Sequence, residues 1–398
     1  MTIQLTQEQL EVKESILSFL LDSKPSMNAV ILQGTAGTGK TTLIKEIYQD
    51  WIHQQQLIQV IDDNHISEEF IFTATTNKAS KVLNQCINRP VTTIQSFLGL
   101  VVRNNSLTIT ERTAYKKGYI IVIDECSYID YILMEYINKY ISQCKIIYVG
   151  DKNQLPPVGF NHSPIYYQNY PIYTLTQQLR QLHSPLIAQA CNALQAYIEC
   201  PTDFPILPLN HEIEHLPQEA FNQVILDIDS NSKVLGIKNT TVNKYNQTLF
   251  QHFNYRKEYK TGDVLVNNHK VYGISTDDIV RIEHVVPNVE ELGVKGTTYT
   301  IDGICYFMPN AISKIKSTIK KYRKERNYKI LRYIENFWID LRPEYAVTIH
   351  KSQGSTYDTV YLDLNDFKSI KDLKEVAKLL YVAISRARYK VVLTGDIR

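Results

Sequence analysis

The stretch Gly34-Thr35-Ala36-Gly37-Thr38-Gly39-Lys40-Thr41 decides how this chain folds. It follows the apolar run Ala29-Val30-Ile31-Leu32, and the residues after it have the pattern of an amphipathic helix. A strand, a glycine-rich turn and a helix N-terminus in this order are typical of a phosphate-binding loop. Glycines let backbone N–H groups wrap a phosphate closely, where a Cβ would obstruct them. The stretch therefore predicts a nucleoside triphosphate site; a chance glycine turn before a helix is the competing interpretation.

Two side chains of this loop have predicted roles of their own. Lys40 can reach the β- and γ-phosphates, and Thr41 can offer its hydroxyl to Mg²⁺. The helix N-terminus adds partial positive charge beside them. The expected cofactors are therefore ATP and Mg²⁺.

Size and composition indicate a globular protein with more than one domain. The chain has 398 residues, of which 44% are hydrophobic and 21% are charged, and this length favours two or three domains. No segment approaches the ~20 apolar residues of a membrane span, and the N-terminal residues lack the pattern of a signal peptide. The six cysteines form no CxxC pair, so we expect buried thiols in a reducing cytoplasm and no membrane partner.

Charge is unevenly distributed along the chain. The net charge is +2, but residues 314–332 contain nine Lys or Arg and one acid, a net of +8 that leaves −6 for the rest. A basic segment in a mildly acidic protein favours a local contact with a polyanion. A solvated helix face is the competing interpretation. A basic helix is predicted here, because four apolar residues are spaced by 3, 4 and 3: Ile312, Ile315, Ile319 and Tyr322.

Strands and helices alternate in the first part of the chain. Residues 6–21 are predicted to form a helix with Thr6 as its N-cap. Buried strands are predicted at residues 70–74, 119–123 and 145–149. This alternation predicts a parallel, doubly wound sheet through about residue 172.

The remaining strand patterns predict a second α/β unit and two insertions. Residues 234–237, 359–362 and 390–393 have the pattern of buried strands. Residues 100–109 are predicted to form a hairpin that turns at Asn104-Asn105. Short strands near Gly and Asn turns predict a small β-barrel insertion, at residues 263–266, 279–282 and 298–301.

An acidic pair follows the buried strand at residues 119–123. Asp124 can hold Mg²⁺ through water, and Glu125 can orient and deprotonate an attacking water. Such pairs often only cap helices. Because this pair stands downstream of a phosphate-binding loop and behind an apolar strand, a catalytic role is favoured.

The ordered motifs of the chain resemble those of superfamily 1 helicases, and their spacing resembles the RecD/Dda branch. The resemblance spans nearly the whole chain. Five stretches carry it and look like motifs I, II, III, V and VI: residues 34–41, 124–127 (Asp-Glu-Cys-Ser), 150–158 (Gly-Asp-Lys-Asn-Gln-Leu-Pro-Pro-Val), 348–354 (Thr-Ile-His-Lys-Ser-Gln-Gly) and 380–388 (Leu-Tyr-Val-Ala-Ile-Ser-Arg-Ala-Arg).

The resemblance implies roles in ATP binding and hydrolysis. Gln9 matches the glutamine that reads adenine, and Gln154 matches the γ-phosphate sensor. Arg180 and Arg386 match the arginines of motifs IV and VI, which would place fixed positive charge on the transferring phosphoryl group. Surface arginines are the alternative for both. The implied nucleotide-binding set is Gln9, Gly34, Thr35, Ala36, Gly37, Thr38, Gly39, Lys40, Thr41, Thr42 and Gly354.

The resemblance also implies contacts with a nucleic-acid strand. Short polar side chains suit phosphate contact without reading the sequence, and an aromatic ring such as that of Phe97 can stack on a base or belong to the core. Gln95 stands where the family often has histidine, and Lys238-Asn239 replaces a usual Thr-Asn. The residues in question are Thr75, Thr76, Thr93, Ser96, Phe97, Asn239, Thr348 and His350.

The expected architecture is an α/β fold with two RecA-like P-loop NTPase domains, a small hairpin insertion and an SH3-like β-barrel insertion. The first RecA-like domain spans residues 1–173 and contains the hairpin at 99–117. The second spans residues 174–252 and 342–398, and the barrel with its basic helix spans 253–341. The resemblance implies a 5′-to-3′ DNA helicase in bacterial or phage-infected cytoplasm, acting as a monomer on single-stranded and forked DNA beside replication or single-strand-binding proteins.

Two other functions stay open from the sequence. One is an enzyme that translocates on single strands, or strips proteins from them, without unwinding a duplex. The other is a DNA-binding clamp that uses ATP only as a structural ligand. Glu125, Gln154, Arg180 and Arg386 argue against the clamp, because a clamp needs none of them.

Overall fold

Two compact units make up the computed structural model of the chain. The first contains residues 1–216 and 349–398, and the second contains residues 217–348. The structure describes residues 4–22, 28–61, 68–103, 106–157, 159–160, 162–179, 184–254, 258–276 and 278–397. Among these residues, none of the helices has both the length and the apolar character that a bilayer crossing requires.

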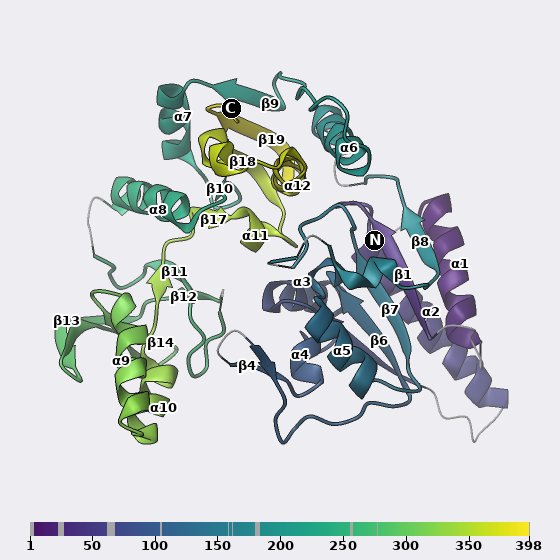
Figure 1. The fold of residues 1–398 in the computed structure, drawn as a ribbon, viewed down its shortest axis with the longest axis horizontal. Coiled ribbons are helices and arrows are strands. Elements are labelled where there is room, and N and C mark those ends of the chain that lie inside the picture. Colours follow the sequence, from purple (N-terminus) through teal and green to yellow (C-terminus); the bar gives the residue numbers. More distant parts are fainter. Residues whose placement is uncertain are drawn as a thin grey trace. The chain divides into compact units, whose positions relative to one another are not determined.

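A six-stranded parallel sheet forms the centre of the first unit (Figure 1). Its strand order is β3-β2-β6-β7-β1-β8, so β7 separates the strand of the phosphate-binding loop from the strand of the acidic pair. The parallel doubly wound sheet predicted from the sequence is confirmed. Its strands are β1 (Ala29–Gly34), β2 (Glu69–Ala74), β3 (Val91–Thr93), β6 (Tyr119–Asp124), β7 (Lys145–Gly150) and β8 (Ile172–Leu175).

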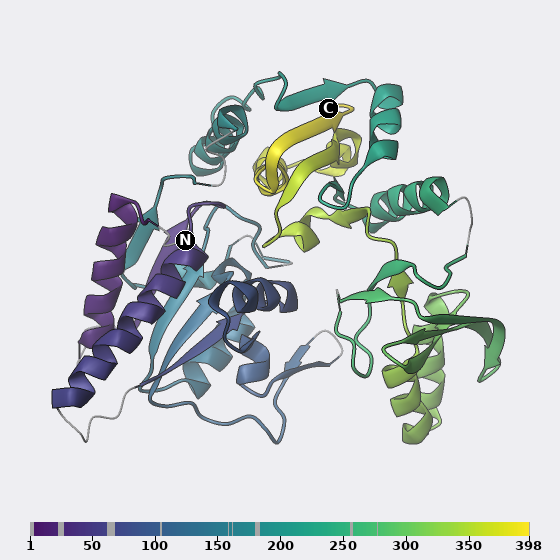
Figure 2. The ribbon, with the colours of Figure 1, turned by 180° about the vertical axis from the view of Figure 1, so that it is seen from behind.

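Both faces of this sheet are buried, because alternate residues of each central strand enter different cores. Val30 and Leu32 of β1 belong to the cluster under α1, α2 and α3, whereas Ala29 and Ile31 belong to the cluster that contains α4 and α5. Figure 2 shows α1 and α2 against the first of these faces. This explains the unbroken apolar run before the phosphate-binding loop. The helices are α1 (Gln7–Leu21), α2 (Lys40–Ile61), α3 (Asn77–Ile87), α4 (Ile94–Phe97) and α5 (Tyr131–Tyr140).

Thr6 caps α1, as predicted. Its hydroxyl accepts from the Gln9 N–H at 3.2 Å, and the Gln9 side chain accepts from the Thr6 N–H at 3.0 Å. This reciprocal capping box satisfies two N–H groups at the start of the helix. It also fixes the position of the Gln9 side chain.

A short antiparallel pair follows α4. In it β4 (Val101–Arg103) pairs with β5 (Ser106–Thr108), and Val101 lies opposite Thr108. Thr110 and Thr113 donate to the carbonyl of Gly99 at 2.7 and 3.0 Å, which ties the segment after the pair to the residue before it. The turn predicted at residues 104–105 lies outside the described residues.

The first unit also contains three strands from later in the chain. They are parallel, with β18 (Tyr357–Asp363) paired to β19 (Ala387–Thr394) and β19 paired to β9 (Ile213–Leu216). Strands at residues 359–362 and 390–393 were therefore predicted correctly. The helices here are α6 (Pro185–Glu199), α11 (Ile349–Ser352) and α12 (Leu373–Ile384).

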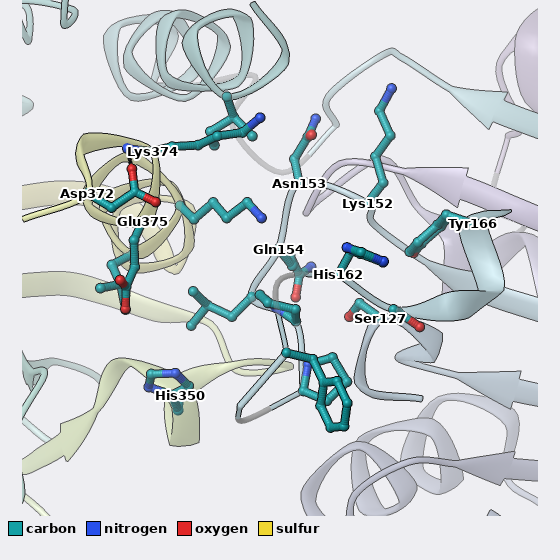
Figure 3. A pocket seen from close by; sticks show the side chains of 18 of the residues that line it. Ser127, Lys152, Asn153, Gln154, His162, Tyr166, His350, Asp372, Lys374 and Glu375 are labelled. Atoms are coloured by element: carbon teal, nitrogen blue, oxygen red, sulfur yellow. Dashed lines mark hydrogen bonds between the residues drawn. The ribbon is translucent and has the colours of Figure 1, made fainter. Parts of the chain in front are cut away.

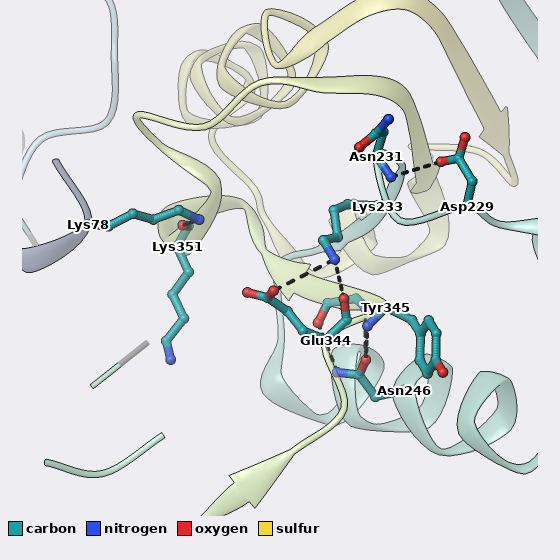
Figure 4. A network of polar contacts seen from close by, with 9 residues as sticks. Lys78, Asp229, Asn231, Lys233, Asn246, Glu344, Tyr345 and Lys351 are labelled. Atoms are coloured by element: carbon teal, nitrogen blue, oxygen red, sulfur yellow. Dashed lines mark hydrogen bonds and ion pairs between the residues drawn. The ribbon is translucent and has the colours of Figure 1, made fainter. Parts of the chain in front are cut away.

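The second unit begins with α7 (Gln218–Val224) and the parallel strands β10 (Lys233–Gly236) and β17 (Ala346–Thr348), between which α8 (Asn239–Asn254) lies in sequence. Buried Asn246 of α8 accepts from the N–H groups of Tyr345 and Ala346, each at 2.8 Å (Figure 4). Lys233 donates to the Glu344 carbonyl. Burial lowers the pKa of Lys233, and the Glu344 carboxylate opposes this shift. The carboxylate lies 3.7 Å from the Lys233 ammonium and stabilises its charged form. These contacts fix the strand that leads into residue 348.

Two three-stranded antiparallel sheets follow α8, and they share one apolar core. Leu265, Val280 and Leu341 of the first sheet pack with Tyr299 and Tyr306 of the second. The sequence pattern predicted strands in β11, β12 and β14 but missed the other three. The first sheet contains β11 (Val264–Asn267), β12 (Ile279–Arg281) and β16 (Leu341–Arg342), and the second contains β13 (His284–Glu291), β14 (Val294–Ile301) and β15 (Ile304–Pro309).

The basic helix predicted from the apolar stripe at residues 312–322 is confirmed, but the basic segment at 314–332 continues past it into a second helix that was not predicted. The segment forms α9 (Ser313–Lys324) and α10 (Tyr328–Phe337), which lie side by side (Figure 1). Arg326 adopts a left-handed φ of 55°, and the Asn327 side chain then caps α10 by accepting from Ile330 N–H at 3.2 Å. A left-handed residue ends a helix, so the chain reverses there. The predicted apolar stripe does face the core beside Phe307 and Trp338.

The cysteine prediction is correct only in part. Cys126, Cys144 and Cys191 are buried, but Cys200 and Cys305 are exposed. Cys200 caps the end of α6, and Cys305 lies on the solvent side of β15.

Candidate functional site

The phosphate-binding loop is a tight turn that needs its glycines. Gly37 and Gly39 have φ values of 88° and 81°, a region that favours glycine. A Cβ on Gly34 would lie 2.6 Å from the Thr38 hydroxyl. Because these positions exclude side chains, the loop runs close around the space in front of α2.

Lys40, the first residue of α2, points back across the loop. Its ammonium donates to the carbonyls of Gly34 at 2.7 Å and Thr35 at 2.9 Å. A lysine placed there adds positive charge at the mouth of the loop, close to the N-terminus of α2. The sequence motif therefore has the structure that phosphate binding requires.

A cavity of about 420 Å³ brings most of the predicted ATP-site residues together. They come from α1, the phosphate-binding loop, the end of β6, the loop after β7, and the segments around α11 and α12. Three predicted residues of the loop do not line the cavity: Gly34, Thr35 and Thr38. The predicted residues that line it are Gln9, Ala36, Gly37, Gly39, Lys40, Thr41, Thr42, Asp124, Glu125, Gln154, Gly354 and Arg386.

The acidic pair lies at the carboxyl end of β6. Burial raises the pKa of Asp124 to about 7; the charge of Glu125 adds to this rise, and Lys40 opposes it. Glu125 adopts a left-handed φ of 53°, which is uncommon for a residue with a side chain. Backbone strain of this kind concentrates at functional sites. Gly354 has a φ of 74°, a region that favours glycine, and a Cβ there would lie in ordinary contact with a Glu125 carboxylate oxygen, at 3.7 Å.

Gln9 is buried against the phosphate-binding loop. Its amide donates to the Thr38 carbonyl at 3.0 Å, and a Cβ on Gly39 would lie 2.6 Å from the same nitrogen. The oxygen of the same amide accepts from the Thr6 N–H in the cap of α1. The capping box therefore aims a glutamine amide at the edge of the nucleotide cavity.

Gln154 and Arg386 line the same cavity. Gln154 is buried and accepts from the Gln353 amide at 3.0 Å. Arg386 is only 2% exposed and is held by the Val382 carbonyl at 3.1 Å and the Ser385 hydroxyl at 3.0 Å. No carboxylate of the described residues pairs with Arg386, so its charge is available to an anion in the cavity. A buried charged side chain without a counter-ion is rare in proteins and usually has a functional reason.

The sequence analysis missed a contact that joins α12 to the loop. The Tyr381 hydroxyl donates to the Asp151 carboxylate at 2.6 Å and accepts from the Ala36 N–H at 3.4 Å. Burial raises the pKa of Tyr381 well above its usual value, so the hydroxyl stays protonated. Both Tyr381 and Asp151 stand inside recognised motifs, but no sequence pattern pairs positions so far apart.

A second cavity, of about 1180 Å³, lies on the other side of Gln154 (Figure 3). Gln154 lines both cavities. In Figure 3 Lys152 and Asn153 stand across the cavity from Asp372 and Lys374, and His350 lies at its edge. Gln154 is therefore placed to respond to a ligand on either side.

Arg180 lies outside the described residues. Its neighbour Leu179 lines the nucleotide cavity, and the Leu179 N–H donates to the Gly37 carbonyl at 2.8 Å. Leu179 therefore lies against the phosphate-binding loop.

The residues predicted to touch nucleic acid differ in their surroundings. The Thr75 hydroxyl is buried and donates to the Glu125 carbonyl at 2.9 Å, so it links its loop to the acidic pair. Gln95 donates to the Thr75 carbonyl at 3.3 Å, which gives this unusual residue a structural place. Thr76 and Thr93 cap α3 and α4.

The other predicted contacts lie in both units. Phe97 is half-buried, with its ring 6.1 Å from that of Tyr119 and beneath the Lys116 ammonium. Ser96 and His350 are exposed in the first unit, whereas Asn239 is exposed and Thr348 is buried in the second.

Two known families match parts of the chain. Residues 21–160 match the AAA domain, and residues 343–394 match the UvrD-like helicase C-terminal domain. The first match covers the phosphate-binding loop and the acidic pair, and the second covers Gly354 and Arg386.

Known proteins resemble the chain over nearly its whole length. The RecBCD enzyme subunit RecD of Buchnera aphidicola subsp. Schizaphis graminum is 22% identical, over 91% of this chain and 69% of its own. The ATP-dependent DNA helicase dda of Enterobacteria phage T4 is 22% identical, over 92% of this chain and 94% of its own. Pif1 helicase from Bacteroides, solved in complex with ADP-AlF3 and ssDNA, has a TM-score of 0.51 at 16% identity, covering 100% of this chain and 94% of its own. Because the identity to Pif1 helicase is only 16%, this similarity shows a shared fold and nothing more.

Proposed function

We propose that this chain, a superfamily 1 helicase of the RecD/Dda type, hydrolyses ATP to move 5′ to 3′ along single-stranded DNA and to unwind duplex DNA. One observation carries the proposal. A single cavity collects a phosphate-binding loop, a strained acidic residue, a buried glutamine and a buried arginine from distant parts of the chain. ATP hydrolysis needs each of these groups.

Hydrolysis is divided among the residues of this cavity. Lys40 and Arg386 place positive charge where negative charge develops on the transferring phosphoryl group. Glu125 orients the attacking water and takes its proton. Gln9 reads the base. Arg180 is proposed, from the family resemblance, to add a second arginine to the phosphoryl group.

Oxygen donors in the same cavity suit Mg²⁺. The Thr41 hydroxyl and the Asp124 carboxylate are hard oxygen ligands, the kind that Mg²⁺ prefers. The raised pKa of Asp124 reports a desolvated carboxyl beside a second acid, and a cation relieves that repulsion. When bound, Mg²⁺ would neutralise charge on the phosphates.

Gln154 is proposed to couple hydrolysis to DNA. It lines the nucleotide cavity and the second cavity, and it accepts a hydrogen bond from Gln353 in the segment that carries His350. A change at the γ-phosphate would therefore alter contacts of the strand-binding segment. Proposed contacts to the strand are Thr75, Thr76, Thr93, Ser96, Phe97, Asn239, Thr348 and His350.

The proposal includes the architecture expected from the family. Residues 1–173 would form one RecA-like domain, and residues 174–252 with 342–398 the other. The β4–β5 pair would be the strand-separating pin, and the two sheets that share a core at residues 253–341 would form an SH3-like barrel. We further propose a monomer that acts in cytoplasmic DNA replication, recombination or repair, because its relatives include phage and bacterial proteins.

ATPase activity with and without single-stranded DNA tests the proposal. We expect single-stranded DNA to stimulate hydrolysis in the wild-type chain, and Lys40→Ala to remove hydrolysis without lowering the melting temperature. Lys139→Ala, an exposed lysine on α5, is the matched control and should hydrolyse ATP normally. Hydrolysis by Lys40→Ala within about tenfold of wild type would reject the assignment of this loop.

A further inference from the structure

Most of the positive charge in the basic segment, residues 314–332, has no acidic partner in the part of the chain that the structure describes. All nine Lys and Arg side chains of residues 314–332 are exposed; eight lie on α9 and α10, and Arg326 lies in the turn between them. Arg323 approaches Glu335 at 4.0 Å. The other eight make no ion pair with any described residue. A surface with this much unpaired positive charge attracts polyanions.

An aromatic groove lies along α10 in the same region. It has a volume of about 580 Å³ and is lined by Tyr328, Lys329, Arg332, Tyr333, Asn336 and Phe337. Two rows run along the helix at a spacing of four: one of Tyr328, Arg332 and Asn336, the other of Lys329, Tyr333 and Phe337. Residues four apart lie on the same face of a helix. Each row thus places a cation next to an aromatic ring or an amide.

The rings of this groove remain accessible. Tyr328 is 70% exposed and Tyr333 is 42% exposed. The Tyr333 ring lies 5.4 Å from that of Phe337, and Tyr272, which is 59% exposed, continues the series 6.1 Å beyond Phe337. The Tyr333 hydroxyl donates to Glu291 at 3.1 Å, which holds the ring in place. Accessible rings in a fixed row offer flat surfaces for stacking.

We propose that this groove binds single-stranded nucleic acid, with bases stacked on the α10 tyrosines and phosphates held by the surrounding lysines and arginines. Stacking on aromatic rings beside a basic groove is how proteins hold single strands without reading their sequence. A solvated helix face would not need exposed rings, and an acidic peptide would use the cations but not the ring faces. The choice of DNA as the strand rests on the proposed function.

Removing one ring tests the stacking. Tyr328→Ala should raise the Kd for oligothymidylate at least about fivefold, since one stacked base contributes that much or more. Tyr328→Phe keeps the ring and should bind like wild type. An abasic oligonucleotide of the same length should bind Tyr328→Ala and wild type equally. Because Tyr328 is exposed, its replacement leaves the core intact. Equal oligothymidylate affinity for Tyr328→Ala and wild type would overturn the proposal.

Removing two charges tests the phosphate contacts. The double change Lys329→Gln and Arg332→Gln should weaken binding of both oligonucleotides and lower the salt slope by about 1.4. Lys260→Gln, an exposed lysine elsewhere in the second unit, is the control and should leave the slope unchanged. If a poly-glutamate peptide binds wild type as tightly as oligothymidylate, and Tyr328→Ala does not change its binding, the groove takes acidic protein and the proposal is wrong.

Photocrosslinking locates the contact directly. Oligothymidylate that carries 5-iododeoxyuridine should form adducts on Tyr328 or Tyr333 in the full chain, read by mass spectrometry. Adducts confined to the first unit would overturn the proposal. The ATPase assay separates this failure from failure of the proposed function: if the groove alone is misassigned, single-stranded DNA still stimulates hydrolysis.

Discussion

Tyr381→Phe should slow ATP hydrolysis by about tenfold while the protein stays folded. The change removes only the hydroxyl that joins α12 to Asp151 and to the Ala36 N–H. A hydrogen bond to a charged group contributes about 1.5–3 kcal/mol. The lower value applies here for two reasons. In the variant Asp151 still accepts a hydrogen bond from the Asn153 N–H at 2.9 Å, and the lost contact to the Ala36 N–H is long, at 3.4 Å. About 1.5 kcal/mol corresponds to roughly tenfold in kcat/KM for ATP.

Steady-state ATPase measurements, with a thermal melt of each variant, test this value. Tyr148→Phe is the matched control, since the Tyr148 hydroxyl is buried in β7 without a hydrogen-bond partner among the described residues. Its removal should leave both activity and melting temperature unchanged or slightly improved. If Tyr381→Phe lowers only the melting temperature, or hydrolyses ATP like Tyr148→Phe, the bridge is structural and does not position the phosphate-binding loop.

Three further predictions follow from the site and from the insertions. Glu125→Gln should still bind ATP in a fluorescent-nucleotide titration while turnover collapses, because shape is kept and the base is lost; surviving turnover would make Glu125 structural. Changing Lys320, Lys321 and Lys324 together to Glu should lower the salt slope of single-strand binding by about 2; an unchanged slope would assign this face of α9 to solvent or a protein. Replacing residues 101–109 by a Gly/Ser turn should preserve ATPase and lower duplex unwinding at least about tenfold; a parallel decline of both would mean that the β4–β5 pair only covers an edge.

Local sequence patterns predicted the strands and loops of the ATP cavity well. Residues 29–32 are all apolar because both faces of β1 are covered, and the glycines of the loop are required by positive φ values and close contacts. Five strands of two to four residues were missed, since such short segments carry too little periodicity: β3, β8, β9, β16 and β17. The longer strands β13 and β15 were missed as well.

Contacts between residues far apart in the chain could not be predicted from the sequence. The bond from Tyr381 to Asp151 joins residues 230 positions apart, and the link from Gln353 to Gln154 spans 199. The break between α9 and α10 had a local signal, the capping residue Asn327, but the continuous basic character of the segment concealed it. The left-handed φ of Glu125 had no signal, because strain at a residue with a side chain is imposed by the surrounding fold.

Strand displacement on tailed duplexes tests the central claim most directly. A labelled duplex with a 5′ single-stranded tail is incubated with the chain and ATP, beside a duplex with a 3′ tail. The account predicts ATP-dependent separation of the 5′-tailed duplex, and none by Glu125→Gln. A wild-type chain that hydrolyses ATP on single-stranded DNA but leaves the 5′-tailed duplex intact would contradict it.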